Sequence, residues 1–198
     1  MARPAEAESP VHVEPPILEE LRTRMERALR ANPDCDPPAD AAALHRYWTV
    51  RLATYGGEER EPFTVGVMVC SQAAYNTTNI VLVSRNGGDV RLAPLPVAHT
   101  RVSYVAGSDE QRIRGIEITG FGATLHATDA MFDPTDATLG SYHRLRGLGD
   151  GSVMTRWRLT DEGFVLETHD IDPTFNGRRD PWRVVENGVA IAGRPLQE

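Results

Sequence analysis

Short runs in which apolar residues alternate with polar ones fill the chain from Tyr47 almost to its C-terminus. In one run Trp48, Val50 and Leu52 occupy every second position, and valines do the same a little further on. A period of two is that of a β-strand with one buried face. About ten such runs, separated by turn residues, are typical of an antiparallel sandwich or barrel. We therefore predict a mainly β fold.

Three turn signals predict where neighbouring strands form hairpins. Asn-Gly-Gly at 86–88 and Asn-Gly at 187–188 accept positive φ at little cost, and residues 160–163 separate two strongly alternating runs. Pro96 is predicted to end a strand, because proline cannot donate to a β-ladder. Strands and helices do not alternate along the chain, which disfavours the doubly wound folds that bind nucleotides.

The segment before the strands is different in composition. Residues 1–16 are acidic and rich in proline, which predicts a flexible tail. Residues 17–46 are predicted to form a helical N-terminal segment, and residues 47–198 a single β-rich domain.

The helix in that segment is predicted to run from Ile17 to Ala31. Glu20 with Arg24 and Glu26 with Arg30 have the spacing of ion pairs on its wet face. Its apolar stripe must dock on the chain's own sheet or on a second subunit, and we expect the first. The stripe consists of Ile17, Leu21, Met25, Ala28 and Leu29.

The charge of the chain narrows the classes of partner. The net charge is −7 over 198 residues, and all 21 cationic side chains counted as lysine plus arginine are scattered arginines. An acidic chain without a basic cluster predicts no nucleic-acid partner. No apolar run approaches the ~20 residues of a membrane span, so no transmembrane segment is predicted. The first residues lack the apolar core of a signal peptide, which leaves a cytoplasmic protein or one whose signal peptide was removed.

Cys35 and Cys70 are the two cysteines of the chain. Two cysteines allow one disulfide in an oxidising compartment and do not require it. The alternative is a buried strand thiol at Cys70 and an incidental loop thiol at Cys35, and the sequence leaves both open.

No motif for a metal, a cofactor or a nucleophilic residue is present. Asp129, Asp133 and Asp136 do not have the spacing of a calcium loop, and the predicted alternative for 133–136 is a turn. No Gly-x-Ser-x-Gly elbow occurs. We therefore predict no catalytic residue, no metal and no cofactor.

Two sets of residues that are far apart in the sequence leave a zinc site and a pair of catalytic carboxylates as alternatives. His126, His143 and His169 would form a zinc site only if their strands were neighbours, since their spacing is not that of paired zinc ligands. A pair of carboxylates that cleaves a glycan could come from residues that sequence spacing cannot place relative to one another. These are Glu117, Asp129 and Asp150.

A weak candidate for a ligand-binding surface combines aromatic, arginine and polar side chains that commonly anchor binding sites. The structural alternative is a turn at 75–78 and core packing for the aromatic rings. Between these residues lies a glycine corner at 147–151, in which Gly149 is predicted to need positive φ. The candidates are Tyr75, Asn76, Arg144, Arg146, Asp150 and Trp157.

Four segments carry a resemblance to a bacterial family, domain of unknown function 1176. They are the segments at 70–76, 132–139, 146–151 and 157–159, and the resemblance extends from Phe63 to Val185. At the glycine corner the cysteine of the family pattern is replaced by Gly151, and a second family cysteine is missing from 168–173. Residues that match the family pattern there are Arg146, Gly147, Gly149 and Asp150, and Tyr75-Asn76 match its Tyr-Asn motif.

The resemblance implies a protein of the bacterial cell envelope, periplasmic or secreted after removal of a signal peptide, and it implies no reaction. We accordingly expect a non-enzymatic binding protein with a protein or glycan partner. Two alternatives are a carboxylate-dependent enzyme that cleaves glycans, and a structural or assembly module that dimerises through the helix at 17–31.

Overall fold

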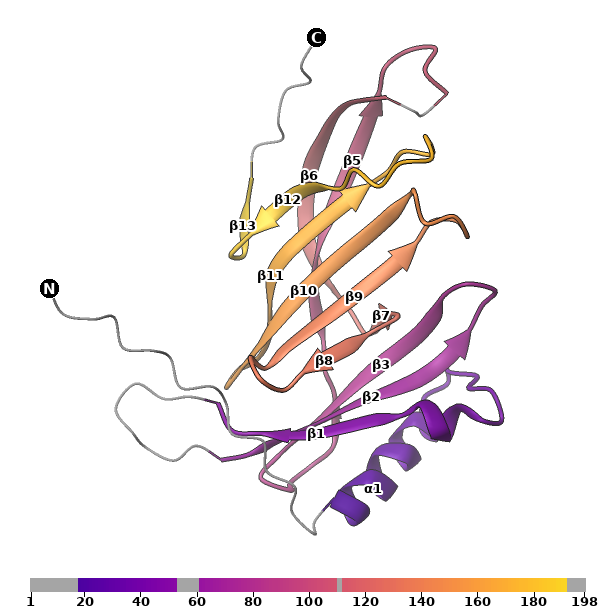
Figure 1. The fold of residues 1–198 in the computed structure, drawn as a ribbon. Helices are drawn as coiled ribbons and strands as arrows, with labels where there is room; N and C mark the ends of the chain where they lie inside the picture. Colours follow the sequence, from indigo (N-terminus) through magenta and orange to yellow (C-terminus); the bar gives the residue numbers. More distant parts are fainter. Residues whose placement is uncertain (1–17, 53–60, 110–111, 192–198) are drawn as a thin grey trace, which may run out of the picture.

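The computed structural model describes residues 18–52, 61–109 and 112–191. The predicted flexible tail at 1–16 lies outside these ranges. The described chain contains one helix, α1 (Leu18–Ala31), one short 3₁₀ turn, η1 (Ala41–Leu44), and thirteen antiparallel strands in three sheets (Figure 1).

The first sheet has five strands in the order β1–β2–β3–β4, with β7 paired to β3. Strand β4 pairs with one end of β3 and β7 with the other end, so both lie along one edge of β3. The strands are β1 (Arg46–Val50), β2 (Phe63–Gln72), β3 (Thr77–Arg85), β4 (Arg91–Leu92) and β7 (His126–Thr128).

The second sheet is a six-stranded meander in the order β13–β12–β11–β10–β9–β8. Strand β8 follows β7 after two residues, so this short segment carries the chain from the first sheet to the second. The strands are β8 (Met131–Asp133), β9 (Thr138–Arg144), β10 (Ser152–Thr160), β11 (Gly163–Asp172), β12 (Trp182–Glu186) and β13 (Val189–Ala190).

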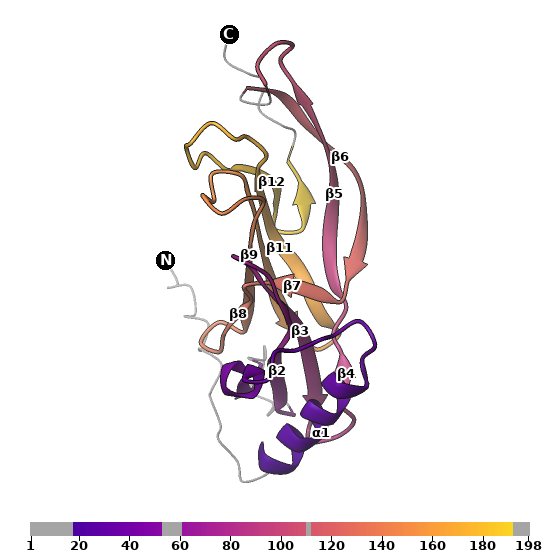
Figure 2. The ribbon, with the colours of Figure 1, turned by 90° about the vertical axis from the view of Figure 1, so that its right-hand side faces the viewer.

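The third sheet is a long hairpin of β5 (Leu95–Tyr104) and β6 (Ile113–Thr124). It forms a separate layer against the second sheet, and its tip extends past that sheet (Figure 2). Register shifts after His99 and after Ser103 bend the hairpin.

The main core lies between the three sheets. Trp157 is its largest fully buried side chain, and Nε1 of its indole donates a 2.6 Å hydrogen bond to the Pro96 carbonyl oxygen of β5. This bond ties the hairpin to the second sheet. Other members of the core are Val65, Val81, Leu95, Phe132, Leu139 and Phe164.

A second, smaller core lies on the opposite face of β2 and β3, under the helix. Met25 and Leu29 of α1 contact Met68 and Ile80 there. Strand β2 is therefore buried on both faces, which explains its continuous apolar run. A Cβ atom on Gly66 would lie 2.7 Å from the Met25 sulfur, so a larger residue there would require the Met25 side chain to shift.

The predicted docking of the helix on its own sheet agrees with the structure, since Leu21, Met25 and Leu29 are all buried within the chain. Glu26 pairs with Arg30 as predicted. The predicted pair of Glu20 with Arg24 is wrong, because Arg24 instead donates to the carbonyl oxygens at 87 and 88 in the β3–β4 turn.

The predicted mainly β fold with an N-terminal helix is confirmed, although the described residues form thirteen strands and their sheets do not close into a barrel. The expected hairpins at 86–88, 160–163 and 187–188 form, with positive φ at Asn86 and Asn187. The prediction that Pro96 ends a strand is wrong. Pro96 lies inside β5, which pairs with β6 alone among the described strands, and an edge strand tolerates a missing N–H. Its carbonyl oxygen accepts the bond from Trp157.

Acid should destabilise the second sheet through His169. Its Nδ1 lies 2.9 Å from the Thr155 hydroxyl, and burial lowers its pKa below the ordinary 6.5. The unfolded chain then binds a proton that the folded chain does not, so stability falls as the pH drops through 6.5 toward the folded pKa. Between pH 7.5 and 5.5 we expect His169 to contribute a loss of up to about 1.4 kcal/mol in the free energy of unfolding.

Urea unfolding of the wild type, His169→Gln and His99→Gln at the two pH values measures this. His99 is exposed on β5 and serves as the control. His45 is also buried with a lowered pKa, so His169→Gln should reduce the pH dependence without abolishing it. An unchanged pH dependence in His169→Gln would contradict the assignment.

Candidate binding face

Three loops from distant parts of the sequence meet at one end of the sheets. They are the β2–β3 turn at 73–76, the β9–β10 corner at 145–151 and the β11–β12 loop at 173–181. All three project toward the right-hand side of Figure 1. We call this surface the loop face.

Asn76 joins the first sheet to the second. Its side-chain Nδ2 donates to the Arg144 carbonyl oxygen at 2.8 Å, and its Oδ1 accepts from the Arg144 backbone N–H at 3.2 Å. One amide side chain thus makes the two bonds that a neighbouring strand would make. The Arg144 guanidinium in turn donates to Asp129 at 2.9 Å, and Asp129 accepts from the Thr77 N–H.

Asp150 joins the corner to the β11–β12 loop. Asp150 is only 2% exposed. Its carboxylate accepts two hydrogen bonds from the Arg146 guanidinium and one, at 2.9 Å, from the Gly177 N–H. The Arg146 guanidinium and the Gly177 amide hold the pKa of Asp150 well below its usual range. Arg146 also donates to the Phe175 carbonyl oxygen and lies 5.1 Å from the centre of its ring. The carboxylate is therefore ionised and fixed.

The glycine corner has the conformation that the sequence predicts. Gly149 has φ of +68°, and its N–H donates to the Arg146 carbonyl oxygen. Gly151 is buried against Phe175, and a Cβ there would lie 2.7 Å from that ring. Packing and hydrogen bonds hold this corner to the 173–181 loop.

The exposed part of the loop face is apolar and cationic. Tyr75 is 41% exposed and Leu148 72%, and Leu145 is exposed beside them. A Cβ on Gly147 would lie 3.6 Å from the Tyr75 ring, so the β2–β3 turn and the corner form one continuous surface. Arg178 and Arg179 are exposed on the adjoining loop.

The structure brings together five of the six predicted ligand-binding residues. Asn76, Arg144, Arg146 and Asp150 form the framework of the loop face. Tyr75 is the exposed member. Trp157 is 2% exposed in the main core, so its prediction as a surface residue is wrong, and the structural alternative holds for it.

Sequence reasoning missed the exposed leucines and the third loop. Leu148 lies among glycines at a turn, where an apolar side chain has no buried position, and this was a readable signal. The Asn-Gly pair at 176–177 marked a turn, but nothing local linked it to Asp150, because that bond spans 27 residues.

The three carboxylates considered for glycan cleavage each lie near a different arginine. Glu117 lies 3.8 Å from Arg101 on the β5–β6 hairpin, and Asp129 and Asp150 are bound by Arg144 and Arg146. A general acid needs a raised pKa, and that of Asp150 is lowered. Asp129 and Asp150 thus take part in the hydrogen bonds that join the loops.

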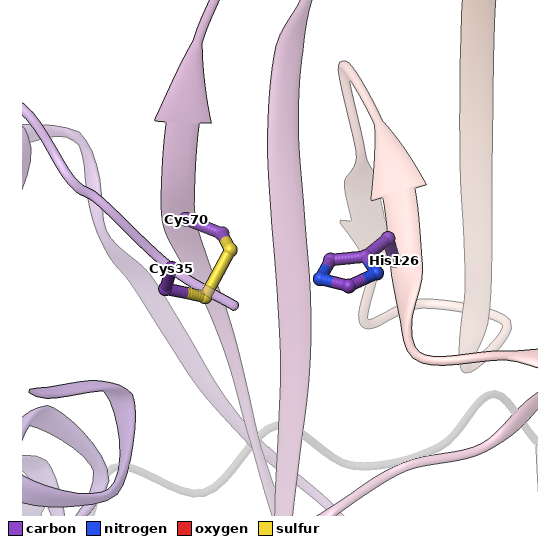
Figure 3. A group of neighbouring side chains, drawn as sticks. All are labelled: Cys35, Cys70 and His126. Atoms are coloured by element: carbon purple, nitrogen blue, oxygen red, sulfur yellow. A yellow bond between two sulfur atoms is a disulfide. The ribbon is translucent and has the colours of Figure 1, made fainter. Parts of the chain in front are cut away.

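The three histidines considered for zinc lie in separate environments. His143 contacts the Thr128 hydroxyl at 3.0 Å, and His169 contacts Thr155. His126 lies beside Cys35 and Cys70, which form a disulfide (Figure 3). The structure thus decides between the two interpretations of the cysteines, and it places no two of these histidines in one ligand cluster among the residues it describes.

A pocket of about 690 Å³ lies at the opposite end of the same strands, between the β3–β4 turn and the β10–β11 turn. Phe63 and Phe164 contribute apolar walls, and Arg85, Arg91 and Glu162 lie at charged parts of its lining. None of the predicted ligand-binding residues lines this pocket.

The chain has no match among protein-family models, curated proteins or solved structures. The resemblance to domain of unknown function 1176 therefore stays a prediction from the residues quoted for it. Within the described ranges, no helix combines the length and the apolar character needed to cross a membrane.

Gly149→Val should destabilise the corner. A β-branched residue at a φ of +68° is strained by roughly 1–3 kcal/mol. Its Cβ would also lie 3.1 Å from the Tyr142 hydroxyl. We expect a melting temperature lower by several degrees, measured by circular dichroism. Gly115→Val is the matched control, because Gly115 is in β6 with open space at its Cβ position. Equal melting temperatures for the two variants would contradict the corner conformation.

Proposed function

We propose that this protein is a non-enzymatic binding protein of the bacterial cell envelope that captures another protein through the loop face. One observation carries the proposal. Three loops are locked together by Asn76 and Asp150, and they present Tyr75, Leu145 and Leu148 to solvent. Binding residues are commonly placed on loops that a rigid scaffold positions.

The energetics of the loop face support recognition. Loops that are already fixed lose little conformational entropy when a partner binds. Tyrosine and arginine are enriched among the residues that contribute most to binding energy, and exposed leucines beside them add apolar area. Because Arg144 and Arg146 are engaged by Asp129 and Asp150, the cations offered to a partner are Arg178 and Arg179.

The exposed leucines favour a protein over a glycan. Leu148 and Leu145 would gain from burial against apolar side chains of a protein, at about 25 cal/mol per Å² of area removed from water. Arg178 and Arg179 favour a partner with carboxylates at the edge of its interface.

The disulfide and the family resemblance support the envelope location. Disulfides persist in oxidising compartments such as the periplasm. The bond between Cys35 and Cys70 is compatible with such a compartment. The helix offers little for assembly, because the apolar residues Leu21, Met25 and Leu29 that would mediate it are buried in the chain's own core.

Site-specific photocrosslinking in bacteria that make the protein tests the proposal. A photoreactive amino acid replaces Leu148 in one variant and Val165 in the control, since Val165 is exposed on β11 of the second sheet. We expect one crosslinked protein from position 148 and none from 165, identified by mass spectrometry.

The affinity of variants for the purified partner then tests whether the loop face makes the contact. Tyr75→Ala and Leu148→Asp should each weaken binding at least about tenfold, or 1.4 kcal/mol, while Val165→Asp should not. All three should keep the wild-type melting temperature. Equal affinities for the Leu148 and Val165 variants would overturn the proposal. Binding to cell-wall glycan that depends on Tyr75 and not on Leu148 would replace the protein partner with a glycan.

A further inference from the structure

The disulfide and one histidine form a cluster of potential metal ligands. The two sulfur atoms and an imidazole nitrogen of His126 all lie within 4.8 Å of one another. The three residues come from different segments, since Cys35 follows the helix, Cys70 is in β2 and His126 is in β7. Figure 3 shows the imidazole ring directed toward the sulfur atoms.

Sheet register places His126 there. Ile80 of β3 is paired with Met68 on one side and with His126 on the other, so these three residues share a face of the sheet. Cys70 lies two residues beyond Met68 on the same strand and belongs to the same small core. The histidine side chain thus reaches across β3 toward the disulfide.

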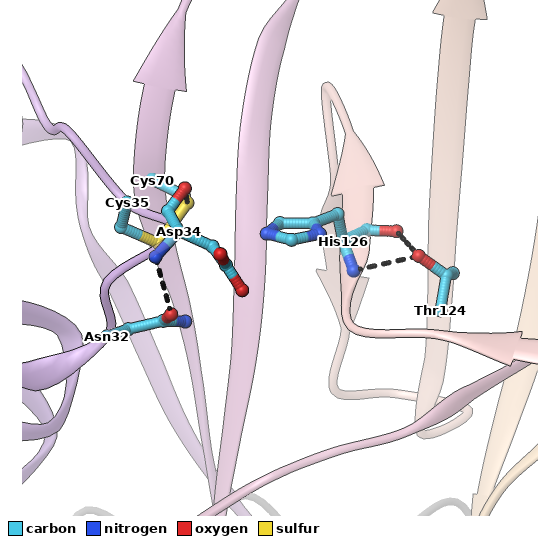
Figure 4. Close-up of a disulfide and its surroundings, with 6 residues drawn as sticks. All are labelled: Asn32, Asp34, Cys35, Cys70, Thr124 and His126. Atoms are coloured by element: carbon cyan, nitrogen blue, oxygen red, sulfur yellow. Dashed lines mark hydrogen bonds between the residues drawn. A yellow bond between two sulfur atoms is a disulfide. The ribbon is translucent and has the colours of Figure 1, made fainter.

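The backbone of His126 is held while its ring is unengaged. Its N–H donates to the Thr124 hydroxyl at 3.1 Å, and its carbonyl oxygen accepts from that hydroxyl at 3.3 Å (Figure 4). Among the residues that the structure describes, neither ring nitrogen makes a hydrogen bond. A half-buried imidazole with an available nitrogen beside two sulfur atoms is a set of side chains that could together hold one metal ion.

We propose that the reduced form of this protein binds one Zn²⁺ ion through the thiolates of Cys35 and Cys70 and an imidazole nitrogen of His126. Thiolate and imidazole are the ligands that zinc prefers, and three protein ligands leave its fourth tetrahedral position to a water molecule. The disulfide is the metal-free state of the same site. The two cysteines therefore alternate between a disulfide bond in the oxidised protein and a pair of metal ligands in the reduced protein.

The interconversion requires a dithiol reductant. Its thiolate attacks the sulfur of Cys35, which is half-buried, and the S–S bond breaks with Cys70 leaving as a thiolate. The second thiol of the reductant then displaces Cys35 from the mixed disulfide. Two electrons and two protons pass to the protein, and the reductant becomes a cyclic disulfide. Zinc binding releases the two thiol protons.

The surroundings of the two cysteines suit this exchange. Cys70 is fixed in a strand and 1% exposed, whereas Cys35 lies outside helices and strands in the segment between α1 and η1. Zinc–sulfur distances of about 2.3 Å require the sulfur atoms to separate. Cys35 can make that movement without breaking a ladder of β-sheet hydrogen bonds.

Metal binding by the full chain tests the proposal. Protein treated with a phosphine reductant, desalted without oxygen, is titrated with Zn²⁺ against a chromophoric chelator, and with Co²⁺ to record thiolate-to-metal charge transfer. We expect one equivalent of Zn²⁺ in reduced protein, none in oxidised protein, and the absorption of tetrahedral thiolate-bound Co²⁺. Equal zinc binding by the two forms, or none by the reduced form, would overturn the proposal.

His126→Ala and His143→Ala separate the proposed ligand from a neighbouring exposed histidine. We expect the first to weaken zinc binding to reduced protein by at least about tenfold and the second to leave it unchanged. Equal affinities would remove His126 from the site. If reduction unfolds the chain, addition of Zn²⁺ should restore the circular dichroism of the folded protein, and failure to do so would also overturn the proposal.

Discussion

The buried carboxylate of Asp150 is the constraint on which the loop face depends. An ionised group that is withdrawn from water must be compensated by hydrogen-bond donors, because an unpaired buried charge disfavours folding. Arg146 and the Gly177 amide are those donors, and they come from either side of the gap between two loops. The corner and the 173–181 loop therefore adopt the conformations that deliver these donors, and Gly149 supplies the turn between Arg146 and Asp150.

Strands β2 and β3 connect the separate parts of the molecule. They separate the main core from the smaller core under the helix, and one end of the pair carries both Cys70 and the 73–76 turn. Cys70 lies near the end of β2, and the turn with Tyr75 and Asn76 begins three residues later. The proposed metal site and the loop face thus share strand β2.

Local patterns explain which parts of the fold could be read from the sequence. Strand positions and hairpin turns follow from alternation and from residues that accept positive φ, so they were predictable. The position of Pro96 within β5 and the burial of Trp157 depend on each other across 61 residues, and no local pattern reports such a pair. For the same reason Arg146 and Asp150, four residues apart, could be predicted from the sequence as neighbours. The 173–181 loop that binds both of them could not be predicted, because its contacts are distant in sequence.

Both strands of the β5–β6 hairpin present an edge that could pair with another chain. Among the described residues its two strands pair only with each other, so it has two open edges. Open edges invite strand addition and aggregation, which proteins prevent with charges and bulges. Here Arg101 and Glu117 lie opposite each other on the outer face, and the irregular register after His99 and Ser103 twists the edge. The bends that let the hairpin follow the second sheet are therefore also irregularities of the kind that disfavours the addition of another strand at its edges.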